Sequence, residues 1–327
     1  MSTALAVPVF CVSLAVTLGA ARLFAGRLDR LGVRFGFPEA LIGLLTAVAA
    51  DGPEISSALV ALIKGAHDVG VGVLVGSNGF NLAAMIGLSA LITGRVRLAR
   101  ETLALEGTVG LIVTLLAAAL LLHWLTAGSA TLLSAVIVVP YLAIVVAGPR
   151  LRGRRLSRLS RALHEHAEIE REPDTRTDPT HHLLALIVLD VALIVAGSAG
   201  MVEAALSLGD HWHISNAVLG VLILAPLTSI PNALTAARLG RAGRGAALVG
   251  ETFNSNTINL GFGVIVPSLF VTFTAVTTLG KLQLAWLVGA TLVALAALAR
   301  RSGMRRSDAV ALVVLYVAFV AGTLVGS

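Results

Sequence analysis

The stretch GVLVGSNGFNL at residues 72–82 has a counterpart, GETFNSNTINL, at residues 250–260, which is 178 positions further along the chain. The same offset holds without a gap from about residue 50 to residue 83. Among the pairs that it aligns are Pro53 with Pro231, Gly65 with Gly243, Gly72 with Gly250, Ser77 with Ser255, Asn78 with Asn256 and Asn81 with Asn259. A proline, two glycines and the motif S-N-x-x-N at one constant offset indicate an internal repeat.

The composition places this repeat in a membrane. The 327-residue chain is 57% hydrophobic and only 13% charged, which is unlike a soluble globular domain. About 20 consecutive apolar residues are needed for a helix to cross a bilayer core. The sequence predicts ten such helices, near residues 4–25, 37–63, 68–93, 102–124, 129–148, 183–207, 214–238, 245–272, 278–299 and 308–325. We therefore expect an all-α polytopic membrane protein.

The arginines predict how these helices are oriented. All 22 arginines fall in alternate connections, within residues 22–34, 95–100, 150–176, 238–244 and 300–306, whereas the other connections carry only Lys64 and Lys281. Because basic residues are retained on the cytoplasmic side, both termini are expected outside and the 149–182 linker in the cytoplasm. The compact linker suits a prokaryotic plasma membrane. The net charge of +6 does not indicate nucleic-acid binding, since the arginines are accounted for by topology.

The repeat divides the chain into residues 1–148, a linker at 149–182, and residues 183–327. Its two copies occupy the second and third predicted helices, and then the seventh and eighth. Five helices separate the copies, and since five is odd the second copy enters the membrane inverted relative to the first. Inverted five-helix repeats with interrupted helices at the midplane are an architecture of secondary transporters.

Proline predicts where the helices are interrupted. Helix two contains DGPE at residues 51–54, and helix seven contains APLTSIPN at residues 225–232. A proline lacks the amide hydrogen and clashes with the carbonyl four residues earlier, so Pro53 should free the carbonyl of Ala49 and Pro231 that of Leu227. Helices three and eight are expected to be interrupted as well. Free carbonyls at membrane depth are tolerated where they line a cavity, and oxygen ligands suit calcium and sodium.

Two carboxylates lie at the first interruption. Asp51 and Glu54 are three residues apart and would share a helical face. Each costs about 2.5–3.5 kcal/mol at the bilayer centre on insertion scales, so we expect both to serve as ion ligands. For Asp51, capping of the following half-helix is an alternative. The repeat places the neutral residues Ser229 and Asn232 opposite these two acids.

The S-N-x-x-N helices supply further candidate ligands. Ser77 and Asn81 share a face of helix three, as Ser255 and Asn259 do in helix eight. Glu251 lies one turn before Ser255 and would aim a third carboxylate at the same centre. The alternative for Glu251 is an ion pair with Arg244 near the cytoplasmic mouth. Asn78 and Asn256 are expected to form hydrogen bonds between helices.

The other ionisable residues do not indicate a function. Glu39 and Glu106 are expected at the cytoplasmic interface, and Glu203 and Asp210 at the outer one. Asp190 lies deeper in helix six, and the sequence indicates no partner for it.

With these motifs, the chain resembles the calcium/cation antiporter superfamily, and specifically the membrane domain of sodium/calcium exchangers. Each repeat of that family carries G-T-S-x-P-E followed by G-N-x-x-G-S-N-x-x-N. Here the first copy reads AADGPE and GVLVGSNGFN, and the second reads LTSIPN and GETFNSNTIN. The resemblance extends over essentially the whole chain. It implies a transporter without a cofactor, rather than an enzyme, that exports Ca²⁺ in exchange for Na⁺ or H⁺ by alternating access.

The resemblance also implies roles for individual residues. Glu54 matches the calcium-binding glutamate of the first repeat, and Asn232 stands where the second repeat has the other glutamate. The family's polar ligands are matched by Ser77, Asn81, Thr228, Ser229 and Ser255, and Asn259 stands where some members have an acid. The implied metal ligands are thus Glu54, Asp51 and Asn232. The sequence departs from the family pattern at Ala50, Asp51, Asn232 and Glu251.

Because of these departures, the sequence leaves open which ions are transported. Adjacent carboxylates resist joint ionisation, so a proton on Asp51 or Glu54 could be the counter-ion. A monovalent cation/proton antiporter and a transport-inactive sensor or scaffold are alternatives of the same fold. A membrane-embedded enzyme that holds magnesium with D-G-P-E is a further alternative. It would need a second acidic cluster, whereas the repeat partner of that motif is S-I-P-N.

Overall fold

The computed structural model describes residues 1–37, 39–97, 103–147, 179–300 and 303–326. Within these residues the chain is helical apart from one pair of short strands, β1 (Arg95–Arg97) and β2 (Gly303–Arg305), which pair antiparallel. Almost all of the predicted linker at 149–182 lies outside the described residues.

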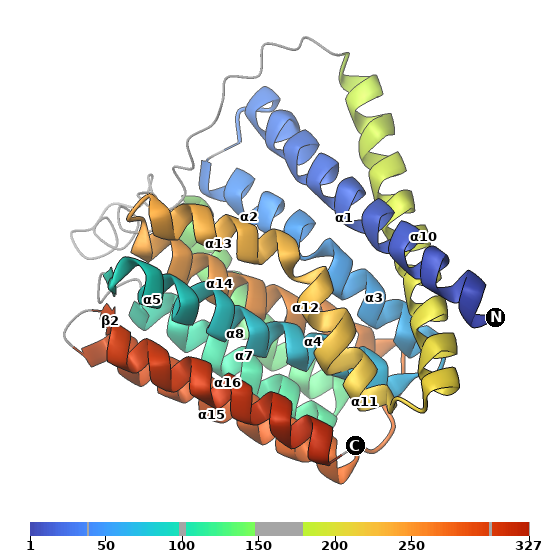
Figure 1. Ribbon diagram of the computed structural model, residues 1–327. Helices are drawn as coiled ribbons and strands as arrows, with labels where there is room; N and C mark the ends of the chain where they lie inside the picture. The colour runs from blue at the N-terminus through green and yellow to red at the C-terminus, as the bar shows by residue number, and fades with distance from the viewer. Residues whose placement is uncertain (38, 98–102, 148–178, 301–302, 327) are drawn as a thin grey trace.

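The helices pack side by side into a bundle (Figure 1). The first half comprises α1 (Thr3–Arg34), α2 (Glu39–Ala50), α3 (Gly52–Ile63), α4 (His67–Phe80), the π-helix η1 (Asn81–Leu88), α5 (Ser89–Thr93), the π-helix η2 (Leu103–Gly107), α7 (Thr108–Leu121) and α8 (Ala127–Ala147). The second half comprises α10 (Thr180–Trp212), α11 (Asn216–Val218), η4 (Leu219–Leu224), α12 (Ala225–Thr228), α13 (Ile230–Arg241), α14 (Gly245–Leu260), η5 (Gly261–Ile265), η6 (Pro267–Leu269), α15 (Thr278–Ala299) and α16 (Arg306–Val325).

Several of these helices have the length and apolar composition to cross a membrane. The described residues contain seven such helices, or nine if each of two bent pairs counts as one span. The bent pairs are α2 with α3, at 49°, and α11–α12 with α13, at 48°. The remaining predicted span, 245–272, forms α14 and η5 and is not among the nine. We attribute this difference to α14 itself, which carries the run ETFNSNTIN and is therefore more polar than its neighbours.

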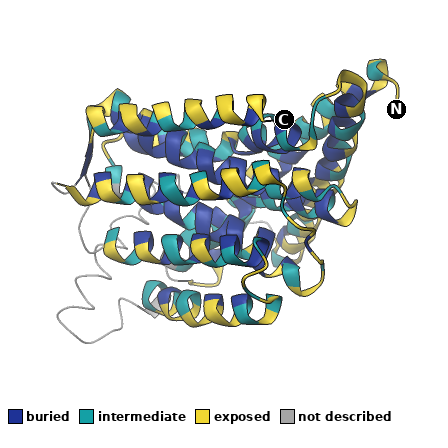
Figure 2. Cartoon of the chain, turned by 90° about the horizontal axis from the view of Figure 1, so that it is seen from below, coloured by how far each residue is buried: buried dark blue, intermediate teal, exposed yellow. Residues whose placement is uncertain are grey.

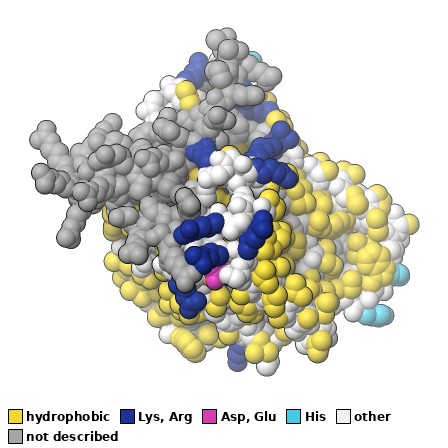
Figure 3. Space-filling view, turned by 60° about the vertical axis from the view of Figure 1, so that its left-hand side comes forward, with side chains coloured by type: hydrophobic (Ala, Val, Ile, Leu, Met, Phe, Trp, Pro, Cys, Tyr) yellow, Lys and Arg dark blue, Asp and Glu magenta, His cyan; other side chains and the backbone are white. Residues whose placement is uncertain are grey.

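Burial separates the centre of the bundle from its periphery. Residues 67–93 form a helical run whose most apolar part is 83% buried, whereas only 11% of the most apolar part of residues 127–145 in α8 is buried. Exposed faces of the outer helices are visible in Figure 2, and they carry large apolar side chains such as Leu132, Val136 and Val139. Apolar side chains cover much of the outer surface in Figure 3, where Lys and Arg gather on one side. Apolar faces turned outward are typical of helices that contact lipid.

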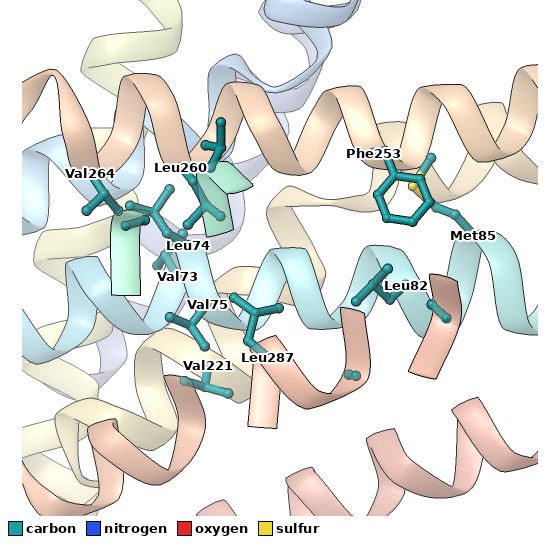
Figure 4. Close-up of a cluster of buried hydrophobic side chains, with 14 of the residues drawn as sticks. Val73, Leu74, Val75, Leu82, Met85, Val221, Phe253, Leu260, Val264 and Leu287 are labelled. Carbon is teal, nitrogen blue, oxygen red and sulfur yellow. The ribbon is translucent and has the colours of Figure 1, made fainter. Parts of the chain in front are cut away.

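Glycines allow the two halves to approach closely at the centre. A Cβ on Gly76 of α4 would lie 2.7 Å from the carbonyl oxygen of Val221 and 2.8 Å from the Cβ of Ala225. One turn earlier, a Cβ on Gly72 would lie 3.2 Å from the Cα of Gly220. Only glycine fits where helix backbones pack this closely. Around this crossing Val73, Leu74 and Val75 pack with Val221, Leu260 and Leu287 in the buried core (Figure 4).

The repeated glycines Gly65 and Gly243 end α3 and α13 in the same way. Both have positive φ angles, of 78° and 71°. The amide after each glycine donates to the carbonyl five residues earlier, from Ala66 to Ala61 and from Arg244 to Leu239. This is the Schellman arrangement, which favours glycine because the left-handed backbone strains other residues. The turn explains why glycine occurs at this position in both copies.

A buried ion pair joins α1 to α10, which lie side by side along one edge of the bundle (Figure 1). Arg27 donates to Asp190 and to the carbonyl oxygen of Leu186. The Asp190 side chain is 1% exposed and that of Arg27 is 13% exposed. The structure thus supplies the partner that the sequence did not indicate for Asp190.

We expect Asp190→Ala to lower the stability of the protein by about 3–5 kcal/mol, because it leaves the Arg27 guanidinium buried without its counter-charge. Thermal unfolding of the purified protein in detergent measures this change. Glu203→Ala is the matched control, since Glu203 pairs with Lys64 but its side chain is 60% exposed. An exposed pair contributes about 0–1 kcal/mol. Equal shifts in the two variants would show that burial of the Arg27–Asp190 pair is unimportant.

Candidate ion-binding site

Two bends of the same kind bring the repeat motifs together. Asp51 lies between α2 and α3 with φ −80° and ψ −3°, and Ser229 lies between α12 and α13 with φ −81° and ψ 3°. Pro53 and Pro231 follow two residues later, at positions where a helix tolerates a missing amide hydrogen. Each pair of helices thus bends at the residue that the sequence places beside its proline.

The bend at Ser229 does not leave the carbonyl of Leu227 free. A backbone N–H at the C-terminal cap of α12 points to this carbonyl. The expectation of a free carbonyl at Leu227 is therefore wrong. The last turn of α12 tightens at the bend, and a shorter hydrogen bond replaces the one that Pro231 removes. Ala49, the equivalent position in the first copy, is fully buried.

The two acids of the first bend meet the second bend at Asn232. Asp51 and Glu54 are 0% exposed. The Nδ2 of Asn232 donates to Asp51 Oδ1 at 2.7 Å and to Glu54 Oε1 at 3.2 Å. It also lies 3.2 Å from the Oγ of Ser255, which itself donates to Asp51 Oδ1 at 2.6 Å. We call Asp51, Glu54, Asn232 and Ser255 the central cluster.

Asp51 does not cap the following helix. Its side chain makes no capping hydrogen bond at the start of α3. The carboxylate is directed to Asn232 and Ser255 instead, so the capping alternative is wrong.

Several oxygens at the two bends have no hydrogen-bond donor. Among the described residues, no partner is found for Asp51 Oδ2, Glu54 Oε2, Ser229 Oγ or Asn232 Oδ1, and all four atoms are buried. A buried polar atom without a partner costs about 1–3 kcal/mol, and more when it is charged. A bound cation would satisfy such oxygens, and oxygen ligands of this kind are those that Ca²⁺ takes.

Asn81 reaches the central cluster from the S-N-x-x-N motif of the first copy. Its Nδ2 donates to Ser255 Oγ at 3.0 Å and to Asn256 Oδ1 at 3.2 Å, and its Oδ1 has no partner. Asn259, by contrast, donates to Asn78 Oδ1 at 3.3 Å, while Asn256 donates to the Asn78 carbonyl at 3.2 Å. Asn78, Asn256 and Asn259 thus join α4 to α14.

The remaining sequence candidates contact their own helices. Ser77 Oγ donates to the carbonyl of Leu74 at 3.1 Å, and Thr228 Oγ1 donates to that of Leu224 at 2.9 Å. Glu251 is partly buried, and in the described part of the chain neither a hydrogen bond to the central cluster nor an ion pair with Arg244 is found for it. The structure does not bring these three side chains into the hydrogen-bonded cluster.

Glu106 is a buried acid that sequence reasoning placed at the membrane interface. Its residue is 5% exposed, so it is buried within the bundle and does not face solvent. It lies on η2, and its carboxylate oxygens would be 2.8 Å and 3.1 Å from a Cβ on Gly250 of α14. Without a side chain, Gly250 leaves room for this carboxylate. The repeat aligns Gly250 with Gly72, but it does not indicate which residue lies against Gly250.

One protein family matches most of the chain. The family described as "Sodium/calcium exchanger protein" matches residues 5–147 and 182–325. This chain belongs to the sodium/calcium exchanger family. It is an integral, multi-pass membrane protein of a family of cation antiporters, and the matched exchangers are transporters rather than enzymes.

Two curated relatives are similar over most of the chain. The putative antiporter CaxA of Alkalimonas amylolytica is 30% identical over 233 residues, which are 69% of this chain and 70% of CaxA. The inner membrane protein YrbG of Escherichia coli (strain K12) is 26% identical over 236 residues, 72% of this chain and 70% of YrbG.

Solved exchanger structures share the fold. The sodium-calcium exchanger NCX_Mj, soaked with 10 mM Na⁺ and zero Ca²⁺, aligns with a TM-score of 0.62 and 20% identity, covering 98% of this chain and 99% of that one. The H⁺/Ca²⁺ exchanger CAX aligns with a TM-score of 0.73 and 16% identity, covering 98% of this chain and 84% of that one.

Proposed function

We propose that the protein is a secondary active antiporter that exports Ca²⁺ in exchange for Na⁺ or H⁺ by alternating access. The observation that carries this proposal is the set of buried oxygens without donors at the paired bends, on Asp51, Glu54, Ser229 and Asn232. We further propose ten transmembrane helices in two inverted repeats, with helices two and seven interrupted at these bends. Cations are the ligands that such a buried, oxygen-lined site favours.

The negative charge of the site favours the binding of a divalent ion, with which a proton would compete. The first bend contributes two carboxylates and the second contributes only a hydroxyl and an amide, so one Ca²⁺ would neutralise the pair. When the ion leaves, two carboxylates remain side by side away from water, and like charges at this distance resist joint ionisation. A proton or Na⁺ that replaces Ca²⁺ would relieve this repulsion, which is the exchange that an antiporter performs.

Asn232 offers a way to fill the site when no ion is bound. Its Nδ2 faces three oxygen acceptors, while its buried Oδ1 has no partner. A cation between the carboxylates would repel Nδ2 and attract Oδ1. A half-turn of the amide would therefore convert Asn232 from a donor that bridges the acids into a ligand of the ion, without a change in the position of the backbone.

We also propose an orientation of the chain in the membrane. With the arginine-rich connections in the cytoplasm, both termini lie outside and the 149–182 linker inside. On the face seen in Figure 3, most Lys and Arg side chains lie close together, as this orientation requires.

Ion flux in proteoliposomes tests the function. Purified protein is reconstituted, Na⁺ and proton gradients are applied separately, and Ca²⁺ movement is followed. We expect at least one gradient to drive Ca²⁺, and the effective gradient identifies the counter-ion. If neither gradient moves Ca²⁺ but a proton gradient moves Na⁺ or K⁺, the monovalent alternative is correct. If no cation moves and Ca²⁺ does not raise the melting temperature, the protein is not an antiporter.

A further inference from the structure

A second group of acids lies one turn of α14 away from the central cluster. Glu106 from η2 reaches α14 beside Gly250, where Glu251 and Asn254 also project. Glu251 precedes Ser255 of the central cluster by four residues, which is about 5.4 Å along a helix. Glu251 interacts electrostatically with Glu106 on one side and with Asp51 on the other. The carboxylates therefore form a continuous series that leads to the central cluster.

Glu106 is unlike an ordinary interfacial glutamate. It is 5% exposed, and its Oε2 has no hydrogen-bond partner among the described residues. The ion pairs Arg27–Asp190 and Lys64–Glu203 do not involve Glu106. Asn254 donates a hydrogen bond to the Glu106 carboxylate, but in the described part of the chain Oε2 remains without a donor and the group has no counter-charge. A buried carboxylate without a counter-charge is costly in a membrane, and a bound cation would stabilise it.

The backbone on both sides is adapted to this carboxylate. A Cβ at position 250 would lie 2.8 Å and 3.1 Å from the Glu106 oxygens, so the carboxylate would have to shift to make room for it. Glu106 itself lies in a π-helical turn, a local distortion that is frequent at functional sites. On α14, Asn254 Oδ1 accepts a hydrogen bond from the hydroxyl of Tyr141 at 2.5 Å. This bond holds the Asn254 side chain beside the acids.

The order of residues along α14 places this group between the arginine-rich end of the helix and the central cluster. The turn before α14, at residues 241–243, is exposed, residues 247–250 are buried, Glu251 and Asn254 are partly buried, and residues 255–260 are buried. An ion that enters from the arginine-rich end of α14 would therefore reach Glu251 and Asn254 before it reaches Asp51.

We propose that Glu106, Glu251 and Asn254 form a second cation subsite, through which a hard cation such as Ca²⁺ passes between the arginine-rich end of α14 and Asp51. Two carboxylates and an amide oxygen are suitable oxygen ligands for such an ion. Its place in a transport cycle rests on the proposed antiport, whereas the binding of a cation at this subsite can be measured without transport.

Equilibrium binding of radioactive Ca²⁺ to the purified full-length protein tests the subsite. Wild-type protein is compared with Glu54→Gln, Glu106→Gln and the double variant. We expect Glu54→Gln to lose the central ion and to retain a second class of Ca²⁺ binding, which the double variant loses. Glu106→Asp should restore part of this residual binding, because it restores the negative charge.

Gly250→Ala provides an independent probe should Glu106→Gln fail to fold. The added methyl group would displace the Glu106 carboxylate, and in the Glu54→Gln background we expect it to weaken residual Ca²⁺ binding by about tenfold or more, on the scale of altered metal-site surroundings. Gly261→Ala is the matched control, since a Cβ there meets no atom within 4 Å.

The possible outcomes separate this subsite from the proposed function. If wild-type protein binds Ca²⁺ and Glu54→Gln binds none, the second subsite does not exist and the central site stands alone. If residual binding is the same with Glu106→Gln or with Gly250→Ala, Glu106 has no part in it. A wild-type protein that binds no Ca²⁺ contradicts both the calcium subsite and the proposed calcium exchange.

Discussion

Glu54→Gln is expected to abolish cation-driven Ca²⁺ flux while the protein still inserts and folds. Glutamine has nearly the same shape, but it removes one negative charge and replaces a carboxylate oxygen by an amide group. Asp51 alone would then face a divalent ion. A hydrogen bond to a charged group is worth up to about 3 kcal/mol, so flux should fall by up to roughly a hundredfold.

Flux in proteoliposomes measures this effect, with equal amounts of reconstituted protein. Folding is checked by the melting temperature in detergent. Glu203→Gln is the matched control, because it makes the same chemical change at a side chain that is 60% exposed and distant from the bends. A Glu54→Gln protein with wild-type flux would remove Glu54 from the site, and with it the central ligand of the proposal.

The repeat predicted much of the central cluster because it fixes residues relative to one another. Position 54 in the first copy corresponds to position 232 in the second, and the structure joins these two side chains by a hydrogen bond. Proline predicted where each helix bends, since its effect on the backbone is local. Each of these inferences needs only the sequence nearby and one repeat offset.

Contacts between helices that the repeat does not relate could not be predicted in this way. Periodicity places Asp190 in the interior of helix six, but it does not show that Arg27 of α1 lies beside it. Glu106 lies near the start of its helix, where an interfacial position is the ordinary expectation. Its burial depends on η2 packing against α14 at Gly250, which is a property of the tertiary structure.

The direction of side chains was equally hard to predict. Ser77 and Thr228 occupy the expected faces, yet their hydroxyls donate to carbonyls of their own helices. Serine and threonine often bond back to the preceding turn, and sequence alone does not exclude it. Asn232 is the contrasting case, because an amide has both a donor and an acceptor and can change its role by turning.

Asn232→Glu should therefore shift the site toward divalent ions and make it more sensitive to pH. The substitution places a third carboxylate beside Asp51 and Glu54, and ligand charge is a main determinant of Ca²⁺ affinity. We expect the ratio of Ca²⁺ to Na⁺ affinity to rise by about tenfold or more at alkaline pH. Because all three acids must lose their protons to bind Ca²⁺, binding should fall more steeply than in the wild type as the pH is lowered.

Competition binding of Ca²⁺ and Na⁺ across a range of pH values measures both effects. Asn216→Glu, which adds the same charge at an exposed position of α11, is the matched control for a change in net charge. If Asn232→Glu and Asn216→Glu behave alike, the amide of Asn232 does not face the ion. A selectivity change specific to Asn232→Glu would instead mean that this amide limits the charge of the site, because it contributes a neutral oxygen at a position where the family resemblance implies a carboxylate.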